Sequence, residues 1–437
     1  MMQSITDGER MDGESMRLDA SLRGVPFAQP VSPQNLIEAG LRPSHGELSL
    51  PALTLDEAAL ASNREIFFRY LAAHGALVAP HAKTPMSPEI VAELRQAGAW
   101  GASVANLQQA AVLMQAGEPR LLLANQIGGI AAGRRLGALL AAHPQVEITA
   151  FADSPASVAG LAIAAEAADR QGLPILVEIG TGRAGARDAQ AVEAVITAVG
   201  ASKGRLRLAG VATYEGAAAS PDPVATQAAI ATLIERTIAA FARIRAIEPE
   251  APLLISAGGS AYFDLVIAAL SPVAQADGRA SLLLRSGAIF FSDHGIYARA
   301  FAALDARGGL VMGDETLSAV ASFRPALRLW AEVLSRPEPG LAIAGFGMRD
   351  VSFDQGLPRL LSVHRDGVEL AGMEGVTVER LNDQHAFLTL PADCDLTVGD
   401  ILCLGISHPC TCLDRWRAVF GLTQDGTVGR VLRTHFG

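Results

Sequence analysis

Eight short apolar segments recur between residues 76 and 290, and alanine-rich stretches with a helical pattern separate them. The segments lie at residues 76–83, 100–106, 120–127, 146–153, 174–180, 206–215, 252–257 and 282–290. Strands that alternate with helices form parallel βαβ units, in which the strands are buried on both faces. Eight such units in roughly 240 residues fit a closed barrel better than an open doubly wound sheet. The pattern therefore predicts an α/β fold built on a (β/α)8, TIM-like barrel.

The C-terminal part of the chain has a different pattern, in which short apolar segments are separated by Gly, Asp and Asn. The candidate strands there are Ala319–Trp330, Leu341–Gly345, Val376–Arg380, Ala386–Leu390, Ile401–Ile406, Trp416–Phe420 and Val428–Thr434. This pattern is typical of a mostly antiparallel β domain. We therefore expect an N-terminal arm at 1–48, a barrel at 49–305 and a C-terminal β domain at 306–437, to which 49–56 can also belong.

The charge of the chain limits the classes of partner. Its formal net charge is −10, and the arginines are dispersed without a basic run, which argues against nucleic acids and anionic membranes. The first residues are charged and form no signal peptide, and no stretch is apolar enough to span a membrane. All four cysteines lie after residue 393, unlike a disulfide framework spread through a secreted fold. We therefore expect a cytoplasmic protein that acts on a small molecule.

Lys83 is the candidate catalytic residue. It lies in A-L-V-A-P-H-A-K-T-P, residues 76–85, at the end of the first expected barrel strand, where barrels place their catalytic groups. The chain has only two lysines, Lys83 and Lys203. A lysine amine can lose its proton and form a Schiff base, whereas a guanidinium cannot. His81 is expected on the same strand face as Lys83. The alternative is a lysine that only extends from the strand end to water.

Gly258, Gly259 and Ser260 follow the seventh expected strand and precede a helix. Glycines allow a ligand to approach the backbone closely, and a helix N-terminus attracts anions. Because barrels often bind phosphate after strands seven and eight, we expect a phosphate site at these residues. The alternative is an ordinary turn in which Ser260 caps the helix.

The segment Gly180–Gly185, G-T-G-R-A-G, matches the dinucleotide pattern G-x-G-x-x-G after a strand. The acidic residue expected about 20 residues later is missing, however, because residues 205–214 contain none. The nicotinamide interpretation is therefore weak. Arg183 is the more informative residue, since it places a cation near the barrel mouth that can contact a heterocyclic nitrogen or an oxyanion. The alternative is a surface charge at a helix start, where the helix dipole disfavours a cation.

His408 and Cys410 lie in I-S-H-P-C-T-C near the C-terminus. If the strand before them continues, both side chains lie on one face and can bind a zinc-like ion with coordination positions open for substrate. The spacing alone is a weak signal, and Pro409 suits a strand end. The alternative is a small buried thiol beside a hydrogen-bonded histidine.

Taken together, these motifs resemble the D-threonine aldolase and D-serine dehydratase family, pyridoxal-phosphate enzymes of the alanine racemase fold type. The resemblance begins near Pro51 and includes A-T-Y-E-G at residues 212–216. It implies that Lys83 forms the Schiff base with pyridoxal 5'-phosphate and that Arg183 lies near the pyridine ring. It also implies that Tyr214 lines the cofactor. The remaining implied residues are Gly258, Gly259 and Ser260 at the phosphate, and His408 and Cys410 as ligands of Zn, Mn or Co. We also expect a homodimer.

The resemblance implies a lyase that acts on a D-3-hydroxy amino acid such as D-serine or D-threonine. Because the metal pair is His-x-Cys, we favour dehydration to a 2-oxo acid and ammonia. The first alternative is cleavage to glycine and an aldehyde, as in a D-threonine aldolase. A nicotinamide oxidoreductase and a non-catalytic protein that binds pyridoxal phosphate are further alternatives, and the metal pair argues against the latter.

Overall fold

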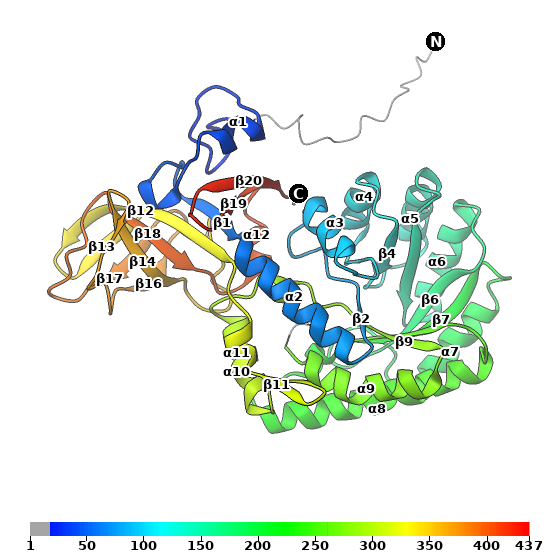
Figure 1. The fold of residues 1–437 in the computed structure, drawn as a ribbon. Helices are drawn as coiled ribbons and strands as arrows, with labels where there is room; N and C mark the ends of the chain where they lie inside the picture. Colours follow the sequence, from blue (N-terminus) through cyan, green and yellow to red (C-terminus); the bar gives the residue numbers. More distant parts are fainter. Residues whose placement is uncertain (1–17, 260, 437) are drawn as a thin grey trace, which may run out of the picture. The chain divides into compact units, whose positions relative to one another are not determined.

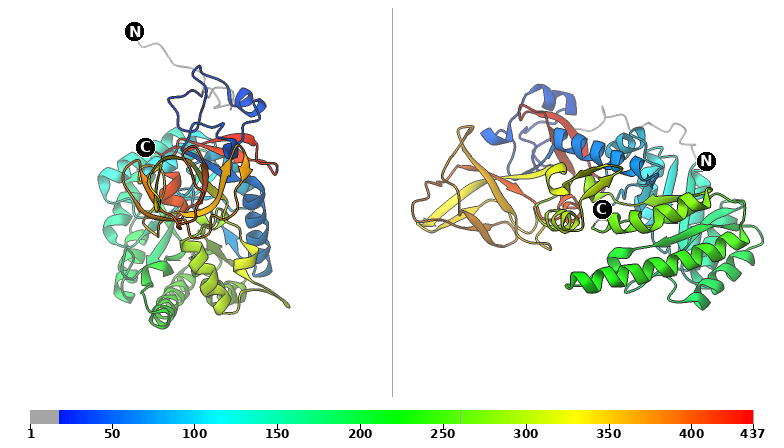
Figure 2. Two further views of the ribbon diagram at one scale, coloured as in Figure 1. Left: turned by 90° about the vertical axis from the view of Figure 1, so that its left-hand side faces the viewer. Right: turned by 60° about the horizontal axis from the view of Figure 1, so that its bottom comes forward.

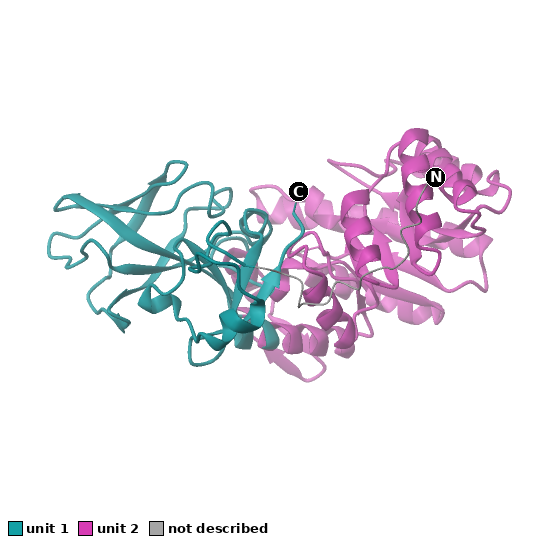
Figure 3. Ribbon diagram, turned by 90° about the horizontal axis from the view of Figure 1, so that it is seen from above, with its two compact units in different colours: residues 1–61, 291–296, 324–437 teal, residues 62–290, 297–323 magenta. Residues whose placement is uncertain are grey.

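The computed structural model describes residues 18–259 and 261–436, so Ser260 and the first part of the expected arm lie outside the described residues. The chain forms two compact units (Figure 3). Unit 1 comprises residues 1–61, 291–296 and 324–437, and unit 2 comprises residues 62–290 and 297–323. Within the described residues, no helix is both long and apolar enough to cross a membrane.

Unit 2 contains a sheet of eight parallel strands in the order β2-β9-β8-β7-β6-β5-β4-β3 (Figure 1). The strands are β2 (Leu77–Val78), β3 (Ala102–Val104), β4 (Arg120–Leu123), β5 (Glu147–Ala152), β6 (Leu173–Ile179), β7 (Leu206–Thr213), β8 (Leu253–Ser256) and β9 (Ala280–Leu284). The two edges of this sheet meet, because the Trp100 N–H donates to Val78 at 2.8 Å and the Ser103 N–H donates to Pro80 at 3.0 Å. The predicted barrel is therefore confirmed, with a strand in each of the eight expected segments.

Helices follow the strands and lie outside the barrel (Figure 1). They are α3 (Pro88–Gln96), α4 (Leu107–Gln115), α5 (Ile130–Ala142), α6 (Pro155–Ala167), α7 (Ala189–Gly200), α8 (Pro223–Ile247), α9 (Phe263–Asp277) and, at the edges of the unit, α2 (Glu57–Ala73), α10 (Ile296–Ala306) and α11 (Ala319–Ser322). Asn106, Ser154, Asp188 and Asp222 cap α4, α6, α7 and α8 by accepting N–H groups of the first turn. Figure 2 shows the long helix α8 on the outside of the unit beside α9.

The interior of the barrel is filled by apolar side chains. Its central cluster consists of Ala79, Leu122, Phe151, Leu176, Ala209, Ala212 and Leu283. Six of these seven residues lie on the strands, one or more from β4, β5, β6, β7 and β9, and Ala79 directly follows β2. The barrel is thus packed through its centre, which leaves its ends for polar groups.

Two barrel strands are shorter than expected. β2 ends at Val78, after which His81 makes a single bridge to Ser103 and residues 82–85 form a turn. β9 ends at Leu284, and the apolar residues that follow form the short helix η4 (Ala288–Phe290). In both places the expected strand was too long. The residues after its hydrogen-bonded part form a turn or a short helix at the end of the barrel.

Unit 1 is built on a mostly antiparallel sheet of ten strands (Figure 2). Its elements are α1 (Pro33–Glu38), η2 (Pro43–His45), β1 (Ala52–Asp56), β12 (Leu327–Glu338), β13 (Leu341–Ala344), β14 (Arg359–Arg365), β15 (Val368–Glu369), β16 (Thr377–Leu381), β17 (Ala386–Thr389), β18 (Ile401–Gly405), α12 (Pro409–Leu413), β19 (Ala418–Leu422) and β20 (Val428–Arg433). β1 is antiparallel to β12 and parallel to β19. The second predicted domain type is therefore confirmed.

One expected strand in the C-terminal part was wrong over its first eight residues, and four strands were missed: β10 (Leu310–Met312), β11 (Glu315–Leu317), β14 and β15. Residues 319–322 form α11, because the Ser318 hydroxyl accepts the Ala321 N–H and caps a helical turn. The strand itself, β12, begins at Leu327, after Pro325. β14 and β15 were not expected, since most of their side chains are only partly buried and give no clear apolar alternation.

Candidate functional site

Lys83 lies in the turn after β2, at the end of the barrel where the parallel strands terminate, and its side chain is exposed in unit 2. The expected shared strand face with His81 was wrong, because the strand has already ended at Val78. His81 is nevertheless electrostatically coupled to Lys83. Burial, followed by the positive charges of Lys83 and Arg285, holds the pKa of His81 well below its usual value of 6.5. A neutral imidazole therefore stands beside the candidate catalytic amine.

Gly287 positions the segment that leads to Lys83. A Cβ on Gly287 would lie 2.5 Å from the carbonyl oxygen of His81 and 2.8 Å from its nitrogen. Both of those atoms belong to the backbone and cannot rotate away. The loop after β9 thus packs directly on the chain after β2, and only glycine allows that approach.

Arg183 and Tyr214 lie together at the barrel mouth. The guanidinium carbon of Arg183 is 4.6 Å from the centre of the Tyr214 ring, a cation–π contact. Gly259 borders the same ring, since a Cβ there would be 2.5 Å from Tyr214 Cε2. The structure therefore brings together three residues that the sequence placed at the cofactor: Arg183, Tyr214 and Gly259.

The glycines at 180–185 serve the packing of their own loop. A Cβ on Gly180 would meet the carbonyl group of Ala184, and a Cβ on Gly185 would meet the backbone of Gly180. The Gly180 N–H donates to Ala186 at 3.2 Å, which closes the loop on itself before α7 begins at Ala189. In a dinucleotide site such glycines face the pyrophosphate and open directly into a helix. This loop does neither, so the nicotinamide alternative loses its main support.

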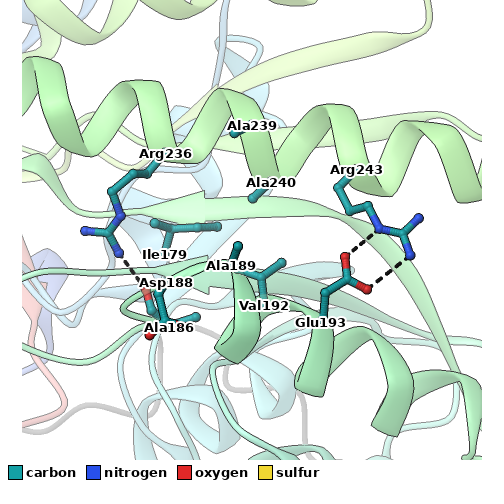
Figure 4. A pocket seen from close by; sticks show the side chains of 10 residues that line it. All are labelled: Ile179, Ala186, Asp188, Ala189, Val192, Glu193, Arg236, Ala239, Ala240 and Arg243. Carbon is teal, nitrogen blue, oxygen red and sulfur yellow. Dashed lines mark hydrogen bonds and ion pairs between the residues drawn. The ribbon is translucent and has the colours of Figure 1, made fainter.

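Arg236 on α8 holds this loop from outside the barrel (Figure 4). Its Nη2 donates to the carbonyl oxygens of Gly180 at 3.4 Å, Ala186 at 3.1 Å and Arg187. Beside Arg236 lies a small cavity of about 130 Å³ between α7 and α8. The loop that carries Arg183 is thus held by a side chain of α8.

Glu178 is a buried carboxyl group near Arg183. Its side chain is 3% exposed, accepts a hydrogen bond from Gln126, and lies 4.0 Å from Arg183 Nη2. Burial raises the pKa of Glu178 above its usual value of 4.5, although Gln126, Arg285 and Arg183 oppose this shift. The sequence motifs gave this residue no role.

Glu215 and Arg285 are two charged residues at the barrel mouth to which the sequence motifs gave no role. Glu215 follows β7 and accepts the N–H groups of Gly258 and Gly259. Arg285 follows β9, and its guanidinium donates to Ser256 Oγ at 2.8 Å and to the Thr213 carbonyl oxygen at 2.6 Å. Each charge follows an apolar barrel strand, as Lys83 does, but nothing in the sequence indicates which groups it contacts.

His408 and Cys410 lie at the start of α12 in unit 1. The strand before them does not continue, because β18 ends at Gly405 and Pro409 occupies the first helical position, which proline favours. The alternative that Pro409 marks a strand end is therefore the one the structure shows. Burial opposes the charged imidazole of His408. Hydrogen bonding to Cys410 and Asp354 outweighs this and raises the pKa of His408 to about 9.

Asp354 fixes the orientation of His408. Its Oδ2 lies 2.6 Å from His408 Nδ1, while its Oδ1 accepts the Thr411 hydroxyl at 2.7 Å. An imidazole held at Nδ1 by a carboxylate presents Nε2 to a metal, as in carboxylate–histidine–metal arrangements. The sequence gave no signal for Asp354, which lies 54 residues before its partner.

The residues fit both groups that the resemblance implies. Near Lys83, the buried Nδ1 of His81 has no hydrogen-bond partner among residues 18–259 and 261–436, which suits a site for a polar ligand. In unit 1, imidazole and thiolate are donors typical of zinc. The described residues contain no group of three or more His, Cys, Asp and Glu side chains placed to hold a metal. A metal here would therefore use the pair and solvent or substrate.

Two family models match the chain. The model described as "Alanine racemase, N-terminal domain" matches residues 55–270, and the model described as "Putative serine dehydratase domain" matches residues 326–422. The curated 3-hydroxy-D-aspartate aldolase of Paracoccus denitrificans (strain Pd 1222) is 25% identical over 376 residues. That match covers 83% of this chain and 85% of the aldolase.

Solved structures show the same architecture. D-threonine aldolase from Filomicrobium marinum has a TM-score of 0.72 at 25% identity, covering 89% of this chain and 95% of the aldolase. D-threo-3-hydroxyaspartate dehydratase from Delftia sp. HT23 has a TM-score of 0.68 at 23% identity, covering 91% and 99%. Two further structures of a D-threo-3-hydroxyaspartate dehydratase carry one alanine replacement each. One replaces a histidine, and the other, in a metal-free form, replaces a cysteine two positions later.

Proposed function

We propose that the chain, which matches the models of an alanine racemase N-terminal domain and of a serine dehydratase domain, is a lyase of D-3-hydroxy amino acids that requires pyridoxal phosphate and a divalent metal. The observation that carries this proposal is the presence of both chemical groups in one chain. The barrel places Lys83 at its mouth, and the dehydratase domain carries His408 and Cys410. A protein that only bound the cofactor would need no metal pair.

Lys83 has two roles in this proposal. Its amine holds pyridoxal phosphate, which when bound supplies an electron sink for the charge left on Cα. With the substrate bound, the free amine of Lys83 would act as the general base that takes the proton from Cα. His81 remains neutral at physiological pH and does not add a second positive charge beside the amine. Arg183, held on the Tyr214 ring, supplies a fixed cation beside the cofactor.

His408 and Cys410 are proposed to hold a divalent metal, which would act as a Lewis acid towards the 3-hydroxyl of the substrate. Asp354 keeps His408 Nδ1 occupied, so that Nε2 is available as the ligand atom. One D-threo-3-hydroxyaspartate dehydratase structure with a replaced cysteine is a metal-free form, which supports this assignment. The histidine replaced in the other structure stands two positions before that cysteine, the same spacing as between His408 and Cys410.

We favour dehydration as the reaction. The 3-hydroxyl leaves, the resulting enamine is hydrolysed, and the products are a 2-oxo acid and ammonia. Retro-aldol cleavage between Cα and Cβ to glycine and an aldehyde is the second candidate, because two of the relatives are named aldolases. Two relatives are named for 3-hydroxyaspartate, so this acidic amino acid is a third candidate substrate beside D-serine and D-threonine.

Product analysis tests the proposal. The purified protein is loaded with pyridoxal phosphate and zinc or manganese, then given D-serine, D-threonine and D-threo-3-hydroxyaspartate, with the L-enantiomers as controls. We expect 2-oxo acid and ammonia to form faster than glycine, and only from D-substrates. Chelation should abolish turnover and leave the visible absorbance of the bound cofactor. Mainly glycine would favour the aldolase, and full activity of a metal-free His408→Ala, Cys410→Ala variant would refute the role of the metal pair.

A further inference from the structure

Glu215 occupies the two backbone donors that the sequence assigned to phosphate. Its side chain is completely buried, at 0% exposed. The Gly259 N–H donates to Oε1 at 2.6 Å, and the Gly258 N–H donates to Oε2 at 3.1 Å, so each carboxylate oxygen accepts one bond. These are charge-assisted hydrogen bonds, which are roughly twice as strong as bonds between neutral groups. An anion therefore already binds this turn, and it belongs to the chain itself.

The same turn is held on its carbonyl side by the end of β9. The Arg285 N–H donates to the Gly258 oxygen at 3.0 Å, and the Ser286 hydroxyl donates to the oxygens of Gly258 and Gly259. The N–H and carbonyl groups of Gly258 and Gly259 are thus all hydrogen-bonded to Glu215, Arg285 or Ser286. The turn links the ends of β7, β8 and β9 into one hydrogen-bonded unit.

Charge balance also ties Glu215 to this place. Burial lowers the pKa of Arg285, while the nearby carboxylates of Glu215 and Glu178 act in the opposite direction. A buried guanidinium without a carboxylate nearby would be costly. To leave the turn, Glu215 would have to give up two hydrogen bonds and the neighbouring positive charge from a position without access to solvent. A fixed carboxylate is therefore favoured over one that a ligand displaces.

We propose that Glu215 is the positioning residue for the phosphate end of the cofactor site, an inference that rests on the proposed function. Its carboxylate sets the conformation of the Gly258–Gly259 turn, where Gly258 has a φ of +79° and the ring of Tyr214 borders Gly259. By accepting the N–H groups of Gly258 and Gly259, the carboxylate holds this turn in one conformation before the phosphate binds beside it. The order of the turn, and hence the strength of phosphate binding, depends on Glu215.

The test compares how tightly the apoprotein binds pyridoxal 5'-phosphate and pyridoxal, which lacks the phosphate. The dissociation constant of pyridoxal divided by that of pyridoxal 5'-phosphate gives a ratio that isolates the contribution of the phosphate. A lower ratio means that the phosphate contributes less to binding. Glu215→Gln keeps the shape of the side chain, removes its charge and directs an amide N–H₂ at one of the two backbone donors. We expect this variant to lower the ratio by about tenfold, the equivalent of ~1.4 kcal/mol, with little change for pyridoxal.

Glu118→Gln is the matched control. Glu118 is also buried, at 5% exposed, and its carboxylate lies 3.3 Å from Arg95 Nε. It precedes β4 and so lies at the opposite end of the barrel from Lys83. This variant should leave the ratio unchanged even if it lowers the stability of the fold. If Glu215→Gln does not fold, Ser286→Ala removes the support on the carbonyl side and should lower the same ratio by roughly threefold.

The outcomes separate this inference from the proposed function. Failure of the parent protein to bind pyridoxal phosphate would refute the proposed function itself. An unchanged ratio in a folded Glu215→Gln variant, or in Ser286→Ala where the former does not fold, would refute the positioning role. Tighter binding of pyridoxal phosphate by Glu215→Gln would also refute it, because it would show that Glu215 competes with the phosphate for the same two N–H groups.

Discussion

Asp354 provides the sharpest test of the metal pair, because it contacts His408 and is not itself proposed as a ligand. The 2.6 Å contact between Asp354 Oδ2 and His408 Nδ1 fixes the ring and, through its negative charge, makes Nε2 a stronger donor to a metal. Asp354→Asn keeps an acceptor oxygen at nearly the same place and removes the charge. The variant therefore separates the electrostatic effect from the geometric one.

The size of the effect follows from the exposure of the contact. Loss of such a partner typically weakens metal binding by about 10–100-fold. The side chain of Asp354 is 40% exposed and that of His408 is 22% exposed, so water screens the charge in part. We therefore expect about tenfold weaker zinc binding for Asp354→Asn, or ~1.4 kcal/mol, and a loss nearer hundredfold for Asp354→Ala, which also frees the ring.

The assay is a competition titration of the purified protein with zinc and a chromophoric chelator. Asp425→Asn is the control, since Asp425 also lies in unit 1 and accepts a threonine hydroxyl, from Thr427 at 2.8 Å, without contacting His408. Zinc affinity should fall in the order parent and Asp425→Asn, then Asp354→Asn, then Asp354→Ala. Zinc binding by Asp354→Ala as tight as in the parent would show that Asp354 does not orient a metal ligand.

Two further predictions concern packing and pH. Gly287→Ala should destabilise unit 2 by about 1–3 kcal/mol and weaken pyridoxal phosphate binding, because its Cβ would lie 2.5 Å from the His81 carbonyl oxygen; denaturant unfolding and cofactor titration measure this. Gly129→Ala, with no atom within 4 Å of the added Cβ, should do neither, and equal behaviour of the two variants would contradict the account. For His294, burial and then Arg328 and Arg359 lower the pKa from 6.5 to about 4, so the unfolded chain binds the proton more tightly and stability falls as pH drops through this window. Between neutral pH and pH 4.5 the free energy of unfolding of the parent should fall by about 2–3 kcal/mol more than that of His294→Gln. The same pH dependence of unfolding in both proteins would refute a buried neutral histidine.

The barrel was predictable because its strands are buried on both faces and therefore appear as continuous apolar runs. The ends of these runs were less predictable, since apolar residues such as Ala288 pack equally well in a short helix after the strand. The pairing of β1 with β12 could not be predicted at all. Leu53 pairs with Leu329, and no local pattern records which of several antiparallel strands lies beside it.

A site residue could be predicted from the sequence where its residue type is scarce. It was missed where its role depends on contact with a residue far away in the sequence. Lys83 stood out because the chain has one other lysine. Glu215 and Asp354 are ordinary acidic residues, and what distinguishes them is contact with Gly259, 44 residues away, and with His408, 54 residues away. Such contacts are consequences of the fold, so they become visible only with the structure.

The central claim is that Lys83 carries the cofactor, and chemical trapping tests it most directly. The protein is incubated with pyridoxal phosphate, reduced with borohydride and digested, and the modified peptide is identified by mass spectrometry. Because the chain has only two lysines, Lys83 and Lys203, the result is unambiguous. The account predicts a pyridoxyl group on the peptide that contains Lys83 and none on the peptide that contains Lys203. Modification of Lys203 alone, or of neither lysine, would contradict it.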